Sequence, residues 1–218
     1  MSPTASECFS QVTLMMKEVA LFGGTFDPIH FGHLRSAGYV VDQLDFNRLI
    51  FVPSASPPHK QNQHVTAAYH RLEMVRLAIR DDPRFACDDC EIQRPGPSYT
   101  IDTVRGFRER LGPVDRLAWI IGADSLAELA GWYRVGELVE LCEIITVARP
   151  GWARPDLSEL GGQLSDEQIE RLTAGILNSP PADVSSTEIR RRVSAGEPID
   201  AFTPGVVVDY IRREGLYR

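Results

Sequence analysis

The stretch VALFGGTFDPIHFGH, residues 19–33, decides the fold. Its first four residues are apolar and are followed by Gly23 and Gly24, as expected of a buried parallel strand that stops at a tight loop. A helix is predicted from about Gly32, because apolar residues then recur at helical spacing: Leu34, Ala37, Val40, Val41 and Leu44. Residues 48–52 make the next predicted strand, before the turn-forming stretch PSASPP at 53–58. Together these segments form one strand, helix and strand unit.

Strands and helices alternate along the rest of the chain. The pattern predicts helices over 67–80, from about residue 100, and over 166–174, 186–195 and 204–214. It predicts strands over 85–92, 117–121 and 144–148, of which the run LAWII at 117–121 is the most apolar. The fold class expected is therefore α/β, a Rossmann-like doubly wound parallel sheet whose ligand crevice lies at the carboxyl ends of the strands.

Length and composition suit one domain. A chain of 218 residues, 43% of them hydrophobic, can bury a sizeable core. We expect a single domain over residues 17–218, after a loosely ordered extension over 1–16. Residues 151–183 hold Gly and Pro pairs around one short helical stretch, so we expect them to be an excursion within that domain.

Charge and targeting signals limit the partners and the compartment. The formal net charge of -7 and the pI near 5.3 argue against non-specific binding to nucleic acid or to an anionic membrane, since both need a basic surface. No stretch approaches a membrane span, and the first sixteen residues lack the pattern of a signal peptide. We therefore expect a cytoplasmic protein, and the sequence leaves open whether it forms a homo-oligomer.

The four cysteines are Cys8, Cys87, Cys90 and Cys142, too few and too scattered for a disulfide framework. Cys87 and Cys90 form a C-x-x-C pair, which leaves metal or redox chemistry as an alternative. Two aspartates lie between them, and no second C-x-x-C or H-x-x-x-H follows to complete a zinc site. We expect free thiols on or near a strand and no metal site built from side chains.

Two histidines follow the first predicted strand, where an α/β sheet places its phosphate contacts. His30 and His33 are three residues apart around the first turn of a helix, so both imidazoles can point at one site and donate to phosphate oxygens. Gly23 and Gly24 would let a phosphate approach the main chain. On these residues alone, partly exposed loop histidines and a zinc site without a third ligand remain alternatives.

A second group of residues, SSTEIR at 185–190, opens the predicted helix at 186–195. Ser185 and Glu188 have the spacing of a capping box, which would start any helix. A helix start is also an anion site, and Arg190 lies in its first turn, where the guanidinium can reach a phosphate. Both capping and phosphate binding stay open at this point.

The two groups together resemble a known family. GGTFDPIHFGH at 23–33 looks like the H-x-G-H signature of the nucleotidyltransferase superfamily, in the form typical of the nicotinate-nucleotide adenylyltransferases. SSTEIR resembles the S-S-T-x-I-R element that binds the β- and γ-phosphates of ATP in that family. The resemblance extends from about residue 19 to the ending EGLYR at 214–218 and is weakest over 151–183.

Further segments resemble the family's mononucleotide site. The loop PPHK at 57–60 resembles one beside the mononucleotide phosphate, with a solvated Lys60 as the alternative. SYT at 98–100 and WY at 132–133 resemble segments that enclose the pyridine ring, although a Trp near a helix end is more often core packing. Asp124, just past the strand at 117–121, could orient a ribose or adenosine group or simply cap a helix.

The resemblance implies that the substrates are ATP and nicotinate mononucleotide. The catalytic residues it implies are His30, His33 and Arg190. The ATP-binding residues it implies are Gly23, Gly24, Thr25, Phe26, His30, His33, Asp124, Ser186, Thr187 and Arg190. The residues it implies for nicotinate mononucleotide are Lys60, Tyr99, Thr100, Trp132 and Tyr133.

The resemblance also implies a mechanism. A phosphate oxygen of nicotinate mononucleotide attacks the α-phosphorus of ATP, pyrophosphate leaves in line, and no covalent enzyme intermediate forms. Such transfers gain mostly from positioning and from neutralising charge, with Mg²⁺ held mainly by the phosphates. One alternative is another nucleotidyltransferase, such as a phosphopantetheine adenylyltransferase, which is usually shorter and lacks the PPHK, SYT and WY segments. A nucleotide-binding module without turnover is the alternative from a different class.

Overall fold

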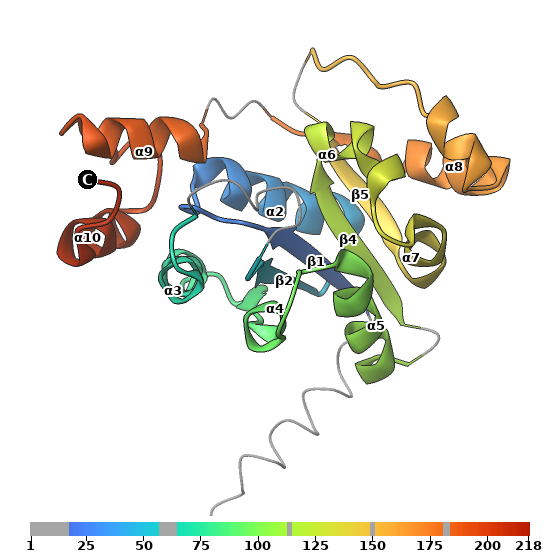
Figure 1. The fold of residues 1–218 in the computed structure, drawn as a ribbon, viewed down its shortest axis with the longest axis horizontal. Coiled ribbons are helices and arrows are strands. Elements are labelled where there is room, and N and C mark those ends of the chain that lie inside the picture. Colours follow the sequence, from blue (N-terminus) through green and yellow to red (C-terminus); the bar gives the residue numbers. More distant parts are fainter. Residues whose placement is uncertain (1–17, 57–64, 113–114, 149–150, 181–183) are drawn as a thin grey trace, which may run out of the picture.

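The structure, a computed structural model, describes residues 18–56, 65–112, 115–148, 151–180 and 184–218. At its centre lies a six-stranded sheet, parallel throughout, in the order β3-β2-β1-β4-β5-β6 (Figure 1). The strands are β1 (Glu18–Gly24), β2 (Arg48–Pro53), β3 (Phe85–Cys87), β4 (Arg116–Gly122), β5 (Glu143–Ala148) and β6 (Ile176–Asn178). The expected α/β, doubly wound parallel sheet is confirmed.

Helices cover both faces of the sheet. The helices are α2 (Phe31–Leu44), α3 (Ala68–Ile79), α4 (Cys90–Gln93), α5 (Thr100–Arg110), α6 (Ala123–Ala127), α7 (Val135–Leu141), α8 (Asp166–Ala174), α9 (Ser186–Ser194) and α10 (Gly205–Glu214), with short 3₁₀ turns η2 (Leu129–Gly131) and η3 (Ser158–Gly162). In β1, Ala20 and Phe22 pack into a core with α2, α3 and α10, whereas Val19 and Leu21 pack into a second core with α5, α7 and α8. The sheet is therefore buried on both faces, which explains its continuous apolar runs.

One predicted strand is only partly correct. The pattern predicts a strand over 85–92, but β3 ends at Cys87 and the chain turns into α4. The Oδ1 atom of Asp88 accepts a hydrogen bond from the main-chain N–H of Cys90 at 2.9 Å, and this local bond diverts the backbone from the sheet. The helix predicted over 166–174 coincides with α8, and the helices predicted over 186–195 and 204–214 correspond to α9 and α10.

The stretch expected to be an excursion adds an edge to the sheet. β6 runs parallel to β5, with Ile176 beside Thr146 and Asn178 beside Ala148. No strand is predicted there, because the four residues between a glycine and two prolines, ILNS at 176–179, are too few to show a period. Because the strands are parallel, the carboxyl end of β6 lies at the same end of the sheet as those of β4 and β5 (Figure 1).

The described cysteines are free thiols. Burial raises the pKa of Cys87, Cys90 and Cys142 to about 12 each, which opposes the thiolate form that metal binding and redox chemistry need. Within the described ranges, no three His, Cys, Asp or Glu side chains are grouped to hold a metal ion. The described helices include none long and apolar enough to cross a membrane. Residues 1–16, with Cys8, lie outside the described part.

Candidate active site

Two cavities adjoin at the carboxyl ends of the central strands. The first, of about 340 Å³, lies between the β1–α2 loop, the ends of β4 and β5, and the start of α9. The second, of about 570 Å³, lies between the ends of β1 and β4, the start of α5, and η2. The two cavities share Gly23, Gly24, Ile121 and Gly122 as lining residues, so molecules bound in them would meet at this wall.

The two histidines lie in the first cavity and also start α2. The Nδ1 atom of His30 accepts a hydrogen bond from the main-chain N–H of His33, and Nδ1 of His33 accepts one from the N–H of His30, each at 3.3 Å. Their rings stack with centroids 3.7 Å apart. A neutral imidazole that accepts at Nδ1 carries its proton on Nε2, so Nε2 is the donor atom of each ring.

The interpretation as exposed loop histidines is wrong for His30. Its side chain is only 6% exposed, because its position as the N-cap of α2 turns the ring inward against His33. The ring of His33 also contacts Phe26 edge to face, with centroids 5.0 Å apart. Both imidazoles are thus fixed in place within the cavity wall.

Gly23 and Gly24 are required for packing. A Cβ atom on Gly23 would lie 2.0 Å from Cζ2 of Trp119, and one on Gly24 would lie 2.8 Å from Cζ of Phe26. The sequence predicts that these glycines let a phosphate approach the main chain. The structure shows that they also leave room for the rings of Trp119 and Phe26. Trp119 lines the second cavity and Phe26 the first, so these glycines shape both.

The loop between β1 and α2 is held by residues from the far end of the chain. The hydroxyl of Ser186 donates to the carbonyl of Pro28 at 2.9 Å, and Nη1 of Arg190 donates to the carbonyl of Asp27 at 2.7 Å. The hydroxyl of Thr203 donates to the carbonyl of Ile29 at 2.8 Å. The two sequence motifs are therefore in direct contact. They lie so far apart in the sequence that no local pattern could reveal this contact.

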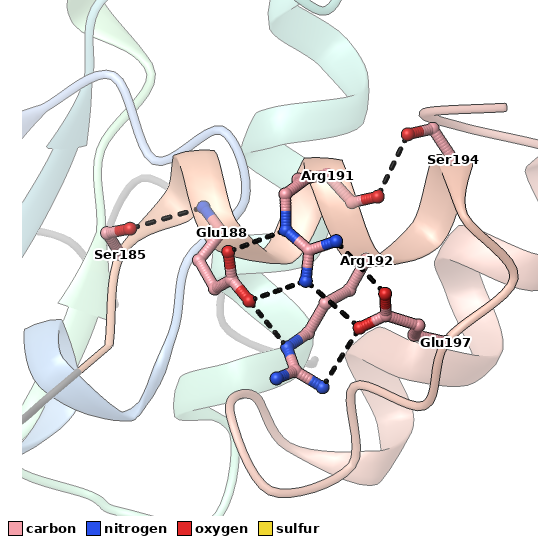
Figure 2. Close-up of polar contacts among 6 residues, drawn as sticks. All are labelled: Ser185, Glu188, Arg191, Arg192, Ser194 and Glu197. Atoms are coloured by element: carbon pink, nitrogen blue, oxygen red, sulfur yellow. Dashed lines mark hydrogen bonds and ion pairs between the residues drawn. The ribbon is translucent and has the colours of Figure 1, made fainter.

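The capping box predicted for α9 is only half formed. The Oγ atom of Ser185 accepts a hydrogen bond from the main-chain N–H of Glu188 at 3.2 Å, as predicted. The carboxylate of Glu188 turns away and accepts from Arg191 and Arg192, and both arginines also pair with Glu197 (Figure 2). The charges of these four residues therefore balance within α9 and the turn after it.

Arg190 differs from Arg191 and Arg192, the two arginines that follow it. Among the described residues it has no carboxylate partner; it donates to the carbonyl of Asp27 and, at 3.3 Å, to the hydroxyl of Thr187. Arg190 and Thr187 line a separate hollow beside the C-terminus, whereas Ser186 lines the first cavity with the histidines. The structure thus brings Ser186 to the histidines and sets Arg190 on the outer side of the loop.

The second cavity collects four of the predicted mononucleotide residues: Tyr99, Thr100, Trp132 and Tyr133. The rings of Tyr99 and Tyr133 lie 4.8 Å apart, and the Nε1 atom of Trp132 is buried without a hydrogen-bond partner among the described residues. Tyr99 is the N-cap of α5, so the main-chain N–H groups that follow it belong to the open first turn of a helix. Such a turn attracts an anion.

Three remaining predictions have different outcomes. Asp124 lines the first cavity, and the cap of α6 is Gly122, so the interpretation of Asp124 as a helix cap is wrong. Thr25, predicted to bind ATP, lines the second cavity and not the first. Lys60 and the rest of the PPHK loop lie outside the described residues.

Sequence reasoning misses a buried polar group in the second cavity. Glu91 is 4% exposed and accepts a hydrogen bond from the hydroxyl of Thr103 at 2.7 Å; burial raises its pKa. Ser98 accepts main-chain hydrogen bonds from Ala55 at 3.1 Å and Ser56 at 3.3 Å, which ties this cavity to the end of β2. Glu91 falls within a stretch predicted to be strand, where a single carboxylate gives no functional signal.

The first cavity also has lining residues that the sequence analysis leaves unassigned. Trp152 and Ser179 come from the stretch expected to be an excursion. Ser179 directly follows β6, and its main-chain N–H donates to the carbonyl of Ala148 at 2.9 Å. Recognition of β6 would have pointed to Ser179, because ligands of a parallel sheet gather at the carboxyl ends of its strands.

Comparison with known proteins agrees with this geometry. Residues 21–192 match the cytidylyltransferase-like family model. The chain is 44% identical over 206 residues to a protein of Symbiobacterium thermophilum described as a probable nicotinate-nucleotide adenylyltransferase, covering 93% of this chain and 96% of that one. It is 41% identical over 202 residues to the nicotinate-nucleotide adenylyltransferase of Bacillus subtilis, covering 93% and 99% of the two chains.

A solved structure shares the fold. The Plasmodium falciparum nicotinic acid mononucleotide adenylyltransferase complexed with NaAD superposes with a TM-score of 0.71 at 18% identity, covering 92% of this chain and 97% of that one. At this identity the likeness shows the fold alone.

Proposed function

The chain belongs to the nicotinate-nucleotide adenylyltransferase family, and we propose that its two adjoining cavities join the adenylyl group of ATP to nicotinate mononucleotide. The products are nicotinate adenine dinucleotide and pyrophosphate, a step in the biosynthesis of NAD. The observation that carries this proposal is the common wall of Gly23, Gly24, Ile121 and Gly122 between a cavity lined by two histidines and a cavity lined by aromatic rings.

ATP occupies the first cavity in this proposal. His30, His33 and Ser186 line it, and the start of α9 offers main-chain N–H groups to a phosphate. Gly23, Gly24 and Phe26 form its wall, and Asp124 is placed to accept from a ribose or an adenosine group. Thr187 and Arg190 reach the phosphate tail from the hollow that they line; the carbonyl of Asp27 holds Nη1 of Arg190, and other N–H groups of the guanidinium donate to phosphate. Thr25 stands at the second cavity, so we propose no direct ATP contact for it.

Nicotinate mononucleotide occupies the second cavity. The pyridine ring stacks on Trp132 beside Tyr99 and Tyr133, and its carboxylate accepts from main-chain N–H groups near Thr100 and Tyr133. Arg134, the cation that follows in sequence, is engaged by Glu137 at 2.7 Å, which leaves recognition of the carboxylate to the main chain. Lys60 is proposed to meet the mononucleotide phosphate on the strength of the family motif alone.

The chemical step is an in-line displacement at the common wall. A phosphate oxygen of nicotinate mononucleotide forms a bond to the α-phosphorus of ATP as the bond from that phosphorus to the bridging oxygen breaks, and pyrophosphate carries away the electron pair. The Nε2–H groups of His30 and His33 donate to oxygens on which negative charge builds. Because positioning and charge neutralisation suffice, no covalent enzyme intermediate is needed.

We include Mg²⁺ as an ion that arrives with ATP. Among the described residues Asp124 is the one carboxylate that lines the first cavity, and no cluster of three metal-binding side chains is present. This donor set fits an ion held mainly by phosphate oxygens, which Mg²⁺ accepts readily. When bound, the ion would neutralise charge on the phosphates.

We propose that the enzyme has a single domain and works in the cytoplasm. One sheet runs through the described residues from β1 to β6, which supports a single nucleotidyltransferase domain over 17–218. The free thiols of Cys87, Cys90 and Cys142 are consistent with a cytoplasmic location. Sedimentation would decide whether the protein self-associates into a homo-oligomer.

A pyrophosphate-release assay tests the proposed function. We expect release to require both ATP and nicotinate mononucleotide, and phosphopantetheine to give none in its place, because it offers no ring to stack between the aromatic residues of the second cavity. Release with phosphopantetheine and not with nicotinate mononucleotide would assign the chain to the alternative activity. No release with any phosphate acceptor would indicate a binding module.

A further inference from the structure

The penultimate residue of the chain reaches back to the β1–α2 loop. The hydroxyl of Tyr217 donates to Oδ1 of Asp27 at 2.7 Å, and Asp27 is only 6% exposed. Burial, and secondly the charge of Asp27, raise the pKa of Tyr217 far above its usual range, so the hydroxyl stays protonated and acts as the donor. The ending EGLYR, noted in the sequence without a role, thus contacts the motif that starts the active site.

Asp27 joins three parts of the chain. While Oδ1 accepts from Tyr217, Oδ2 accepts from the main-chain N–H of Thr66 at 3.1 Å. Its main-chain carbonyl accepts from Nη1 of Arg190 at 2.7 Å. A shift of this one residue would therefore move the acceptor that holds Arg190.

A buried arginine also secures the same loop. Arg71 is 1% exposed, and its guanidinium donates to the carbonyls of Thr25 at 2.7 Å, Thr66 at 2.7 Å and Ala55 at 3.3 Å. A buried charge is tolerated when hydrogen bonds satisfy it, and here the acceptors are main-chain carbonyls of the loops around the site. Because Arg71 fixes Thr25, the position of Asp27 depends on the groups that donate to its carboxylate, Tyr217 and Thr66.

We propose that Tyr217 is a positioning residue for adenylyl transfer. Its hydrogen bond to the Asp27 carboxylate fixes the main-chain carbonyl that orients Arg190, and thereby sets where Arg190 meets the phosphate tail of ATP. The inference rests on the proposed ATP site. A positioning residue should change the affinity for ATP and leave that for nicotinate mononucleotide unchanged. A residue that only anchors the C-terminus should change stability and not the affinity for ATP.

The test compares Tyr217→Phe with a matched control. Tyr210→Phe also removes one tyrosine hydroxyl near the end of the chain, but that hydroxyl pairs with Nδ1 of His70 at 2.9 Å and not with Asp27. We expect Tyr217→Phe to raise the KM for ATP about five- to tenfold, a smaller effect than loss of a charge-assisted hydrogen bond to ATP itself, with the KM for nicotinate mononucleotide within about twofold. Tyr210→Phe should leave both KM values within about twofold.

The route through Arg190 is tested in a double variant. In an Arg190→Ala background, Tyr217→Phe should raise the KM for ATP no further, because the residue it positions is gone. Independent additive effects would overturn the inference. So would a Tyr217→Phe variant with a lowered melting temperature and an unchanged KM for ATP, since that result describes an anchor.

A binding measurement keeps the inference separate from the proposed function. Titration calorimetry with a non-hydrolysable ATP analogue needs no turnover, and Tyr217→Phe should weaken that binding five- to tenfold by the same argument. Should Tyr217→Phe fail to fold, Asp27→Asn replaces it, because it weakens the same acceptor. Wild-type protein that binds the analogue but releases no pyrophosphate would sink the proposed function alone; equal binding by wild type and variant would sink this inference alone.

Discussion

His30 and His33 cap the start of α2, and the proposed phosphate contacts use the same two rings. Each accepts a main-chain hydrogen bond at Nδ1, and this leaves Nε2 of each ring as the donor. The same bonds that start α2 therefore set the tautomer that a phosphate would require. Spacing alone predicts a shared site for the two rings; it does not reveal that the rings stack and cap the helix for each other.

The histidines should matter more for rate than for binding. His30→Ala and His33→Ala should each lower kcat about a hundredfold or more, because loss of one donor to developing charge typically costs about 2.7 to 4 kcal/mol. His30→Ala should also lower the free energy of unfolding by about 0.5 to 2 kcal/mol, since it removes the cap of α2. Tyr69→Ala, exposed on α3 and outside the cavities of the site, is the control in steady-state assays and thermal melts. Near-normal kcat in both active-site variants would remove the motif from the mechanism.

Arg190 should act on ATP alone. Arg190→Ala should raise the KM for ATP at least tenfold, in line with a charge-assisted hydrogen bond of about 1.5 to 3 kcal/mol, while the melting temperature stays within a few degrees. Arg190→Lys should recover part of this loss, because a lysine cannot reproduce the planar fork. Arg192→Ala is the control, since its guanidinium is paired with Glu188 and Glu197. An unchanged KM for ATP would leave α9 with a capping role only.

Within α9, the residues that stabilise the helix differ from those proposed to bind phosphate. Ser185 caps it, and the Glu188, Arg191, Arg192 and Glu197 network balances charge at its outer side (Figure 2). The sequence pattern S-x-x-E predicts that Glu188 completes the cap, but two arginines three and four residues later compete for the carboxylate and win it. Helical spacing explains this outcome, and the capping motif alone does not.

The charge network predicts a pH-dependent stability. Hydrogen bonds from Arg191, and secondly from Arg192, lower the pKa of Glu188 to about 2 from an ordinary value of 4.5. A carboxyl group whose pKa is lowered in the folded state stabilises the fold above its unfolded pKa, and the contribution is lost as the pH falls through the folded pKa. Glu188→Gln should therefore melt below wild type at pH 6, and the gap should narrow between pH 4.5 and about 2.

Glu109→Gln is the control for this experiment. Glu109 lies on α5 and makes no ion pair with another described residue, so its substitution should leave the melting temperature close to that of wild type at each pH. A gap between wild type and Glu188→Gln that does not change with pH would contradict the argument.

Gly23, near the end of β1, has no side chain, and this leaves room for the ring of Trp119. Gly23→Ala would place Cβ 2.0 Å from Cζ2 of Trp119, and such overpacking typically costs about 1 to 3 kcal/mol. Because Trp119 lines the second cavity, the KM for nicotinate mononucleotide should rise as the melting temperature falls. Gly106→Ala is the control, since its added Cβ meets no described atom within 4 Å. Wild-type stability and KM in Gly23→Ala would show that Trp119 moves aside freely.

At the scale of the whole molecule, the parallel sheet brings distant segments to one edge. Sequence periodicity predicts most strands and helices, because apolar runs and helical spacing are local properties. It misses β6, which is short, and it cannot predict that residues from α9 and the C-terminus contact Asp27 and Pro28. The motifs identify the residue types of the site; tertiary packing decides that Thr25 lies at one cavity and Phe26 at the other.

We expect the second cavity to recognise the carboxylate of the pyridine ring. Main-chain N–H groups at the start of α5 suit a carboxylate better than a carboxamide, whose NH₂ group would face a donor. At about 1.5 to 3 kcal/mol for each charge-assisted hydrogen bond, two such bonds favour nicotinate mononucleotide by about a hundredfold or more. Trp132→Ala should weaken both forms through lost stacking, with a smaller change in their ratio.

The most direct test is the ratio of kcat/KM for nicotinate mononucleotide to kcat/KM for nicotinamide mononucleotide, measured at saturating ATP. The two substrates differ in one group of the pyridine ring, so their ratio reports on recognition of that group alone. We expect the acid to be preferred by about a hundredfold or more, as the two charge-assisted hydrogen bonds require. Equal values, or a preference for the amide, would show that the main-chain N–H groups do not select the carboxylate.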